Sequence, residues 1–287
     1  MIFLKNSIKR ILRKSDINRY IQYLCQQEKA MHTQKKYARD LMALLAFLPN
    51  GICEKEVLLT WKSYLCEQFA PSTVNSMIAA LNGFLSFQNW NDLRIKPLKI
   101  QKVLFCQEEK ELTKQEYQRL VKAAQGIKNQ RLALVLQTIC STGIRVSELK
   151  FITVKTVETG RAEVVCKGKR RMVFLPDKLC ARLRKYLHKN KISSGPIFIT
   201  KTGKPLDRSN IWRDMKSICK RAKVSPQKVF PHNLRHLFAR TYYSVEKDIS
   251  RLADLLGHTS VTTTRIYMVE SGAIHAQHIE RLGLIIT

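Results

Sequence analysis

Residues 231–240, Pro-His-Asn-Leu-Arg-His-Leu-Phe-Ala-Arg, contain side chains that could do chemistry. His232, Arg235 and His236 are three and four positions apart, a spacing that puts them on one face of a helix. Such a face, directly after a proline that can begin a helix, can hold a phosphate, bind a metal ion or lie in solvent. Zinc-binding helices of hydrolases have Glu after the first His, but this chain has Asn233 there and no third ligand is indicated. The pattern therefore disfavours a metal site, and His236 is expected to pack or to bond to the backbone.

Arg145 stands two residues after Gly143, at the predicted start of a helix. Free backbone amides and the positive end of the helix dipole favour an anion at such a position, and a guanidinium adds two parallel donors. Glu148, three residues further on, lies on the same face and can hold the guanidinium in place. By themselves these residues are more typical of a surface salt bridge.

Lys167, His258 and Tyr267 complete the set of candidate reactive side chains. Lys167 is at the turn of a predicted hairpin, from which a flexible lysine can reach a phosphate oxygen and donate a proton, although a charged hairpin tip is the simpler interpretation. His258 follows Gly257 at the predicted end of a helix. Tyr267 comes nine residues later in an apolar stretch, where a tyrosine usually belongs to the core.

In order and spacing, these residues resemble the catalytic set of the tyrosine recombinase (phage integrase) family. The matching segments are TGIRVSEL with Arg145, KGKRR with Lys167, PHNLRHLFA with His232 and Arg235, LLGH with His258, and TTTRIY with Tyr267. Glu148 matches the acidic position that accompanies them in the family. The first hundred residues resemble the family's SAM-like core-binding domain, which begins with Thr-x-x-x-Tyr-x-x-x-Leu, here Thr33, Tyr37 and Leu41. The compact length is similar to Xer-type and transposon-borne members.

The resemblance implies that Tyr267 attacks the scissile phosphate of DNA and forms a 3′-phosphotyrosyl bond, releasing a 5′-hydroxyl. A 5′-hydroxyl of a partner strand then attacks the phosphotyrosine and releases the enzyme. The covalent step divides one difficult displacement into two and conserves the bond energy, so that no ATP is required.

The same resemblance assigns roles to the other residues. Arg145 and Arg235 would bind the non-bridging oxygens of the pentacoordinate phosphorane, and His258 would add another donor. Lys167 would protonate the leaving 5′-oxygen, and His232 would assist proton transfer at the tyrosine. No metal or other cofactor is implied, because the arginines take the electrostatic role.

Helical periodicity predicts a small bundle in the first hundred residues, with helices at 32–48, 51–69 and 71–90. Thr33 is the expected cap of the first of these, and a basic amphipathic helix is expected at the N-terminus. Residues 91–111 lose the periodicity and contain a proline, which indicates a linker.

The second part of the chain begins with a capping box of Thr113 and Glu116. Gly143 is predicted to end a helix in the left-handed conformation. Residues 161–176 contain two β-rich runs around a glycine, which predicts a hairpin, and residues 195–200 are a candidate short strand. The remainder is predicted to be helical.

These patterns predict a mainly α protein with a small antiparallel β-sheet. Residues 1–95 would be the helical SAM-like core-binding domain, residues 96–112 a linker, and residues 113–287 a mixed α/β tyrosine recombinase catalytic domain. The two domains would form a clamp around duplex DNA.

The chain has 51 Lys and Arg against 22 Asp and Glu, a net charge of +29 that favours a polyanion as partner. Membrane-binding proteins usually concentrate such charge on one amphipathic helix, whereas here it is spread along the chain, which favours a nucleic acid over a membrane. The resemblance implies that this partner is double-stranded DNA with a specific recombination site. Segment 207–221 is the candidate major-groove helix, since Arg and Asn recognise guanine and adenine edges; a solvated basic helix is the alternative. The candidate DNA contacts are Lys35, Lys36, Arg39, Arg208, Asn210, Arg213 and Lys216.

Eight scattered cysteines without a Cys-x-x-Cys pair indicate free thiols in a reducing compartment. The apolar start of the chain is too short for the core of a signal peptide, and no stretch is long enough to span a bilayer. We therefore expect a cytoplasmic, nucleoid-associated protein; an organelle transit peptide is the alternative.

The C-terminal segment 271–287 is rich in Ile and Leu. It either covers the core of its own domain or, as the resemblance implies, docks onto the neighbouring subunit of a homo-tetramer on DNA. Accessory DNA-bending proteins are further candidate partners.

Three other functions share part of this pattern. A type IB topoisomerase has similar Tyr-Arg-Lys-Arg-His chemistry but relaxes supercoils as a monomer, and the helical bundle together with His232 favours a recombinase. A DNA-binding regulator without catalysis is opposed by the complete set of reactive residues. A metal-dependent nuclease would lose its activity in EDTA.

Overall fold

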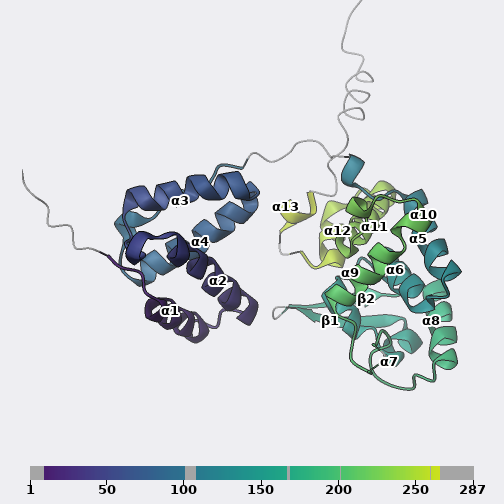
Figure 1. Ribbon diagram of the computed structural model, residues 1–287. Helices are drawn as coiled ribbons and strands as arrows, with labels where there is room; N and C mark the ends of the chain where they lie inside the picture. Colours follow the sequence, from purple (N-terminus) through teal and green to yellow (C-terminus); the bar gives the residue numbers. More distant parts are fainter. Residues whose placement is uncertain (1–9, 101–107, 167–168, 201, 259, 266–287) are drawn as a thin grey trace, which may run out of the picture. The chain divides into compact units, whose positions relative to one another are not determined.

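The computed structural model describes residues 10–100, 108–166, 169–200, 202–258 and 260–265 (Figure 1). The chain divides into two compact units, Met1–Lys102 and Val103–Thr287. None of the described helices combines the length and apolar character that a bilayer crossing requires.

Over its described residues 10–100, the first unit is a bundle of four helices around one apolar core. Its elements are α1 (Lys14–Gln26), α2 (Met31–Phe47), the 3-10 turn η1 (Pro49–Gly51), α3 (Lys55–Gln68), α4 (Pro71–Phe87) and the 3-10 turn η2 (Asn91–Leu93). The core side chains recur at helical spacing, and the largest fully buried ones include Tyr20, Trp61 and Phe84. The predicted helical bundle is therefore confirmed, and Pro71 occupies the first turn of α4 as expected.

Two local predictions in the first unit were wrong. Helix α2 begins at Met31 after Ala30, so Thr33 lies inside the helix and does not cap it. Helix α3 begins at Lys55, later than predicted, because Pro49–Gly51 form a 3-10 turn in which Asn50 and Gly51 have positive φ angles of 51° and 72°.

The predicted basic helix at the N-terminus is not present in the described residues 10–13. This segment is extended: the Leu12 amide donates to the Gly51 carbonyl at 2.8 Å and the Cys53 amide donates to the Arg10 carbonyl at 2.8 Å. Leu12 is fully buried, so tertiary burial of this apolar residue outweighs the local helical pattern. Residues 1–9 lie outside the described part.

The second unit is mainly α with one small sheet. It begins with η3 (Glu108–Lys110), α5 (Lys114–Gly126), α6 (Gln130–Thr142), η4 (Val146–Phe151), α7 (Val154–Thr159), β1 (Arg161–Cys166), β2 (Lys169–Phe174) and α8 (Asp177–Lys189). It continues with α9 (Arg208–Ser217), α10 (Cys219–Ala222), η5 (Pro226–Lys228), α11 (Pro231–Glu246), α12 (Ile249–Leu256) and α13 (Val261–Thr264). Helix α6 is buried on nearly every side and packs against α5, α8, α9 and α11.

The predicted boundary signals of this unit are confirmed. The Glu116 amide donates to the Thr113 hydroxyl at 3.1 Å, and the Thr113 amide donates to the Glu116 carboxylate at 2.8 Å, so the capping box closes the start of α5. Gly143 ends α6 in the left-handed conformation, with φ 64° and ψ 14°.

Strands β1 and β2 form the predicted antiparallel hairpin, with Arg161 opposite Phe174 and Val164 opposite Arg171. Side chains alternate between the two faces, so that Val164 and Val173 are buried whereas Phe174 is exposed. This alternation places Arg171 on the inner face, where an arginine requires a partner.

Residues 195–200 do not form the predicted strand. The Ile197 amide donates to the Ile152 carbonyl at 3.0 Å, whereas Phe198 accepts from the Leu206 amide at 2.9 Å. The two ends of the segment therefore pair with different neighbours, and only isolated bridges form. The C-terminal segment 271–287 lies outside the described residues.

Candidate active site

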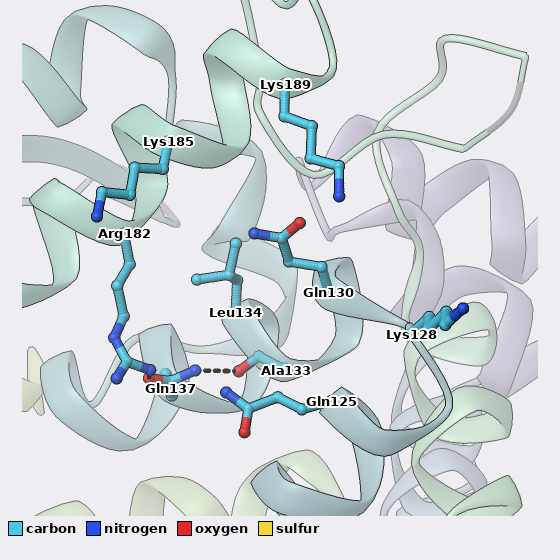
Figure 2. Close-up of a pocket in the computed structure, with 9 residues that line it drawn as sticks. All are labelled: Gln125, Lys128, Gln130, Ala133, Leu134, Gln137, Arg182, Lys185 and Lys189. Atoms are coloured by element: carbon cyan, nitrogen blue, oxygen red, sulfur yellow. Dashed lines mark hydrogen bonds between the residues drawn. The ribbon is translucent and has the colours of Figure 1, made fainter.

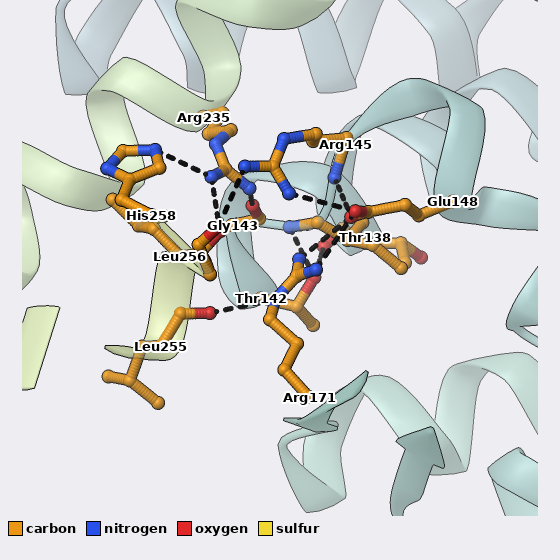
Figure 3. A network of polar contacts seen from close by, with 12 residues as sticks. Thr138, Thr142, Gly143, Arg145, Glu148, Arg171, Arg235, Leu255, Leu256 and His258 are labelled. Atoms are coloured by element: carbon orange, nitrogen blue, oxygen red, sulfur yellow. Dashed lines mark hydrogen bonds and ion pairs between the residues drawn. The ribbon is translucent and has the colours of Figure 1, made fainter. Parts of the chain in front are cut away.

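Five polar residues of the second unit meet where several of its elements end (Figure 3). Arg145 directly precedes η4 and Glu148 lies within it. Arg171 lies on the inner face of β2, Arg235 in the first turns of α11 and His258 in the loop after α12. Four of these residues were predicted from the sequence, and Arg171 was not.

Arg235 is the buried centre of this cluster, with only 2% of its surface exposed. Its guanidinium donates to the Gly143 carbonyl and to the Leu256 carbonyl, the latter at 2.6 Å. Both carbonyls stand at the C-terminal ends of helices, where the negative end of the helix dipole attracts a cation. The guanidinium is therefore fixed before any ligand binds.

Two glycines allow these helix ends to approach closely. Gly143 and Gly257 have positive φ angles of 64° and 63°. A Cβ atom on Gly143 would lie 2.5 Å from the Phe238 ring, and one on Gly257 would lie 2.6 Å from Cδ of Arg171. Any other residue would therefore be strained in its backbone and would displace a neighbouring side chain.

Glu148 is a single buried carboxylate, 2% exposed, that serves two arginines. It accepts from the Arg145 amide at 2.9 Å, from Arg145 Nη1 at 2.9 Å, and from Arg171 Nη1 and Nη2 at 2.9 and 2.8 Å. Burial by itself would raise the pKa of Glu148, but the hydrogen bonds from Arg171 and from the Arg145 amide outweigh burial and hold the pKa below its usual range. Glu148 is therefore ionised and orients both guanidinium groups.

Arg171 joins the hairpin to the loop that follows α12. Besides its two bonds to Glu148, its Nε donates to the Leu255 carbonyl at 3.1 Å, and only 11% of its side chain is exposed. Sequence reasoning missed this residue. The alternating pattern of β2 could have identified it, because Arg171 is two positions from the buried Val173 and therefore lies on the same, inner face of the strand.

Arg145 is the most exposed arginine of the cluster, with 33% of its side chain accessible. In addition to its bond with Glu148, its Nη2 donates to the Gly257 carbonyl at 3.2 Å. Arg145, Arg171 and Arg235 against Glu148 leave the cluster with two excess positive charges. The arrangement therefore favours an anion that approaches from the side of Arg145.

The hydrogen bonds of His258 define its tautomer. Its Nε2 lies 3.1 Å from Nη2 of Arg235, and a guanidinium can only donate, so this ring nitrogen is the acceptor. The proton of the neutral ring is then on Nδ1, which donates to the Thr264 hydroxyl at 2.8 Å. Burial and the charges of Arg235 and Arg145 lower the pKa of His258 to about 4, in agreement with a neutral ring. His258 must exchange its bond with Arg235 before Nε2 can donate to a phosphate.

His232 lies one residue into α11 and is exposed, although the surrounding protein partly desolvates its ring. This desolvation and the charges of Arg235, Arg145 and Arg208 lower the pKa of His232. A neutral imidazole beside the arginines suits proton transfer.

His236, one turn further along α11, packs edge-to-face against His232 with ring centroids 4.5 Å apart. Burial lowers the pKa of His236 to about 4. Asn233 donates to the Lys110 and Lys228 carbonyls at 2.8 Å each and fixes the start of the helix. Among the residues that the structure describes, no three His, Cys, Asp or Glu side chains are grouped closely enough to hold a metal ion.

Lys167 and Tyr267 lie outside the described residues. Strand β1 ends at Cys166 and β2 begins at Lys169. Tyr267 follows the last described residue, Arg265, by two positions.

In the first unit, the three candidate DNA contacts lie on α2. Lys35 and Arg39 are exposed, the latter with 77% of its side chain accessible. Lys36 is less exposed because its ammonium pairs with the buried Asp40 carboxylate and lies 3.4 Å from the Ser76 carbonyl. Lys35 and Arg39 are therefore the better placed of the three for a ligand.

The predicted basic helix 207–221 is divided into α9 and α10, and α9 begins with a capping box. The Asn210 amide donates to the Asp207 carboxylate at 2.7 Å, and the Asn210 side-chain oxygen accepts from the Asp207 amide at 3.4 Å. The Asn210 side chain therefore has a structural role at the start of the helix, and Arg208 is exposed beside it.

Further along α9, Lys216 donates to the Pro226 carbonyl and lies over the Trp212 ring, 5.3 Å from its centroid. Arg213 is exposed. Trp212 is 49% exposed, a large aromatic side chain beside basic residues that sequence reasoning did not select.

The chain matches the models of a known protein family. The model of the phage integrase family matches residues 110–272, and that of the phage integrase N-terminal SAM-like domain matches residues 17–91. The tyrosine recombinase XerA of Pyrococcus furiosus is 26% identical over 285 residues, which cover 96% of this chain and 96% of the relative.

Solved structures show the same fold. A lambda integrase dimer bound to a COC′ core site has a TM-score of 0.74 and 20% identity over 92% of this chain and 97% of that chain. A lambda integrase tetramer bound to a Holliday junction has a TM-score of 0.72 and 18% identity over 91% of this chain and 78% of that chain. The predicted fold class, a SAM-like helical unit followed by a mixed unit with a small sheet, is confirmed.

Proposed function

This chain belongs to the phage integrase family, and we propose that it is a site-specific tyrosine recombinase that cleaves and rejoins duplex DNA. The observation that supports the reaction is the preformed arginine cluster around Glu148. Its two excess positive charges are fixed by helix ends and a buried carboxylate, so little reorganisation is needed when a phosphodiester binds.

In the proposed reaction, Tyr267 attacks the phosphorus and the bond to the 5′-oxygen breaks, which leaves a 3′-phosphotyrosine and a 5′-hydroxyl. Lys167 protonates the leaving oxygen, and the proton of the tyrosine passes to His232. Arg145 and Arg235 bind the non-bridging oxygens as negative charge accumulates on them. These are the roles that the resemblance to the family implies.

His258 can bind the phosphate only after its Nε2 has lost the hydrogen bond from Arg235. In the arrangement described above its Nε2 accepts from Arg235 and its Nδ1 donates to Thr264. A bound phosphate oxygen would take over the Arg235 donor. The Thr264 hydroxyl can then turn to donate to Nδ1, which leaves the ring proton on Nε2 for the phosphate.

DNA is the proposed partner of both units. We assign residues 1–95 to core binding, 96–112 to the linker and 113–287 to catalysis; the division after Lys102 falls within this linker. The candidate DNA contacts are Lys35, Lys36, Arg39, Arg208, Asn210, Arg213 and Lys216, of which Lys35, Arg39, Arg208 and Arg213 are exposed. The proposed location is the cytoplasm, in association with the nucleoid.

The proposed assembly is a homo-tetramer on DNA in which segment 271–287 docks onto a neighbouring copy. The lambda integrase tetramer on a Holliday junction, which has the same fold, supports this assembly. An apolar pocket of about 380 Å³ between α5, α6 and α11 is the candidate acceptor, lined among others by Tyr117, Leu237, Phe238 and Val245. Truncation after residue 270 should then leave DNA binding intact and abolish the tetramer in sedimentation analysis.

The central experiment traps the covalent intermediate. Wild type, Tyr267→Phe and the control Tyr243→Phe are incubated in EDTA with fragments of the gene's flanking DNA and quenched with SDS. We expect DNA that migrates with protein, at a reproducible position, in the wild type and the control but not in Tyr267→Phe. Adduct formation by Tyr267→Phe, or its absence in the wild type on nicked substrates that trap the intermediate, would contradict the proposal.

Two further readouts separate the alternatives. Strand exchange between duplexes indicates a recombinase, whereas relaxation of supercoils without exchange indicates a type IB topoisomerase. Full activity in EDTA excludes a metal-dependent nuclease.

A further inference from the structure

A second charged site lies in the second unit (Val103–Thr287), the proposed catalytic unit, away from the arginine cluster (Figure 2). It is a pocket of about 440 Å³ between the N-terminal half of α6, the loop that precedes it and one face of α8. Its lining residues are Gln125, Lys128, Gln130, Ala133, Leu134, Gln137, Arg182, Lys185 and Lys189.

The charge of this pocket has one sign. Lys128, Arg182, Lys185 and Lys189 line it, and no carboxylate is among the lining residues of the described chain. Three of these cations are at positions i, i+3 and i+7 of α8, which places them on one face of the helix. Like charges in one pocket repel each other, so an anionic ligand stabilises this arrangement.

The polar groups between the charges are amides. Arg182 extends from α8 and donates to the Gln137 side-chain oxygen at 2.8 Å, and Gln137 in turn donates to the Ala133 carbonyl at 2.8 Å (Figure 2). Gln125 and Gln130 add two further amides. Each amide offers an acceptor as well as donors, which matches the N–H and C=O groups of a peptide backbone.

The lining disfavours a nucleic acid as ligand. A polyphosphate has acceptors only and makes no use of the glutamine oxygens. None of the described lining residues is aromatic, so a nucleobase would find no surface for stacking. A cavity of this size admits a peptide segment, whereas a rigid duplex would contact only its rim.

The pocket lies along the N-terminal half of α6, whereas the arginine cluster lies beyond its C-terminal end. Along the helix, Gly143 is about 20 Å from Gln130, which begins it, and about 9 Å from Gln137, the last lining residue of α6. A ligand confined to the pocket therefore does not have to contact the cluster.

We propose that this pocket is a docking site for an acidic peptide segment of a partner protein. The cations bind Asp or Glu side chains, the glutamine amides pair with the peptide backbone, and Ala133 and Leu134 form the apolar floor. None of the residues that line the pocket belongs to the arginine cluster, so the site does not depend on the recombination chemistry.

The test measures binding of fluorescein-labelled hexaglutamate to the full chain by fluorescence anisotropy, with hexaglutamine as the uncharged probe. The pocket variant Arg182→Gln/Lys185→Gln/Lys189→Gln is compared with Lys155→Gln/Lys178→Gln/Lys220→Gln, which removes the same charge from exposed positions outside the pocket. We expect the pocket variant to bind hexaglutamate about tenfold more weakly, since three partly exposed ion pairs are lost. The control should lose less than about twofold, and hexaglutamine should not bind to either.

Gln130→Trp provides a second test that does not alter charge. The bulky ring fills the pocket, so hexaglutamate affinity should again fall about tenfold while the melting temperature stays within about 2 °C of the wild type. Equal losses in the two triple variants would show attraction by the overall charge and overturn the proposal. A pocket variant that loses duplex affinity more than peptide affinity would identify a DNA contact and overturn it as well.

Discussion

Replacing Arg171 tests whether the buried ion pair organises the candidate active site. In Arg171→Met, Glu148 loses two of its four hydrogen bonds and the Leu255 carbonyl loses its donor. Removing one partner of a buried pair costs about 3–5 kcal/mol, and we expect about 3 because Arg145 still pairs with Glu148. For a unit of this size, that corresponds to a fall in melting temperature of about 6–12 °C.

The neighbouring residue supplies a matched control. Arg170 lies 3.4 Å from Glu163 on the exposed face of the same hairpin, with side chains 77% and 52% accessible. Arg170→Met should therefore cost less than about 1 kcal/mol. The two variants remove the same side chain from adjacent positions and differ only in burial and partners.

Two measurements test this prediction. Urea unfolding of the full chain, followed through the transition of the catalytic unit, gives the free energy of unfolding of each variant. Covalent adduct formation on DNA should fall about 100-fold in Arg171→Met, because Arg145 and the loop that bears His258 lose a common support, and remain near wild type in Arg170→Met. If the two variants differ by less than about 1 kcal/mol and form adduct at similar rates, the reasoning is refuted.

Three further predictions concern the cluster and the residues around it. Arg235→Lys keeps the charge but not the bonds to two helix ends, so adduct formation should fall at least about 100-fold while DNA affinity in a gel shift changes less than about tenfold. Gly257→Ala should destabilise the chain more than Gly195→Ala, since both glycines have positive φ but only Gly257 faces a neighbour within reach of a Cβ; equal melting temperatures would contradict the steric argument. The pKa values of His236 and His258 are about 4, below the value of about 6.5 in the unfolded chain. The contribution of each neutral ring to stability is therefore complete above about pH 6.5 and is lost as the pH falls toward 4. Between these values the free energy of unfolding should fall by about 1 kcal/mol per pH unit for each group. In urea unfolding between pH 7 and 4, His236→Phe should reduce this slope, and an unchanged slope would show that another group is responsible.

The sequence by itself determined the local structure of the catalytic unit. The capping box at Thr113, the left-handed end at Gly143 and the hairpin at 161–176 are set by interactions within a few residues, so their signals are readable along the chain. The order of Arg145, Arg235 and His258 also predicted a phosphate site through its resemblance to a known catalytic set, and the structure brings these three residues together.

Tertiary structure determined the properties that depend on contacts between segments far apart in the sequence. The segment at Leu12 is extended because it pairs with Gly51 and is buried, although its local pattern is helical. Arg171 acquires a role because the hairpin directs it to Glu148, 23 positions away. His258 is a neutral acceptor because α11 brings Arg235 to its Nε2. Burial and charge depend on neighbours that lie far apart in sequence, and packing alone brings those neighbours together.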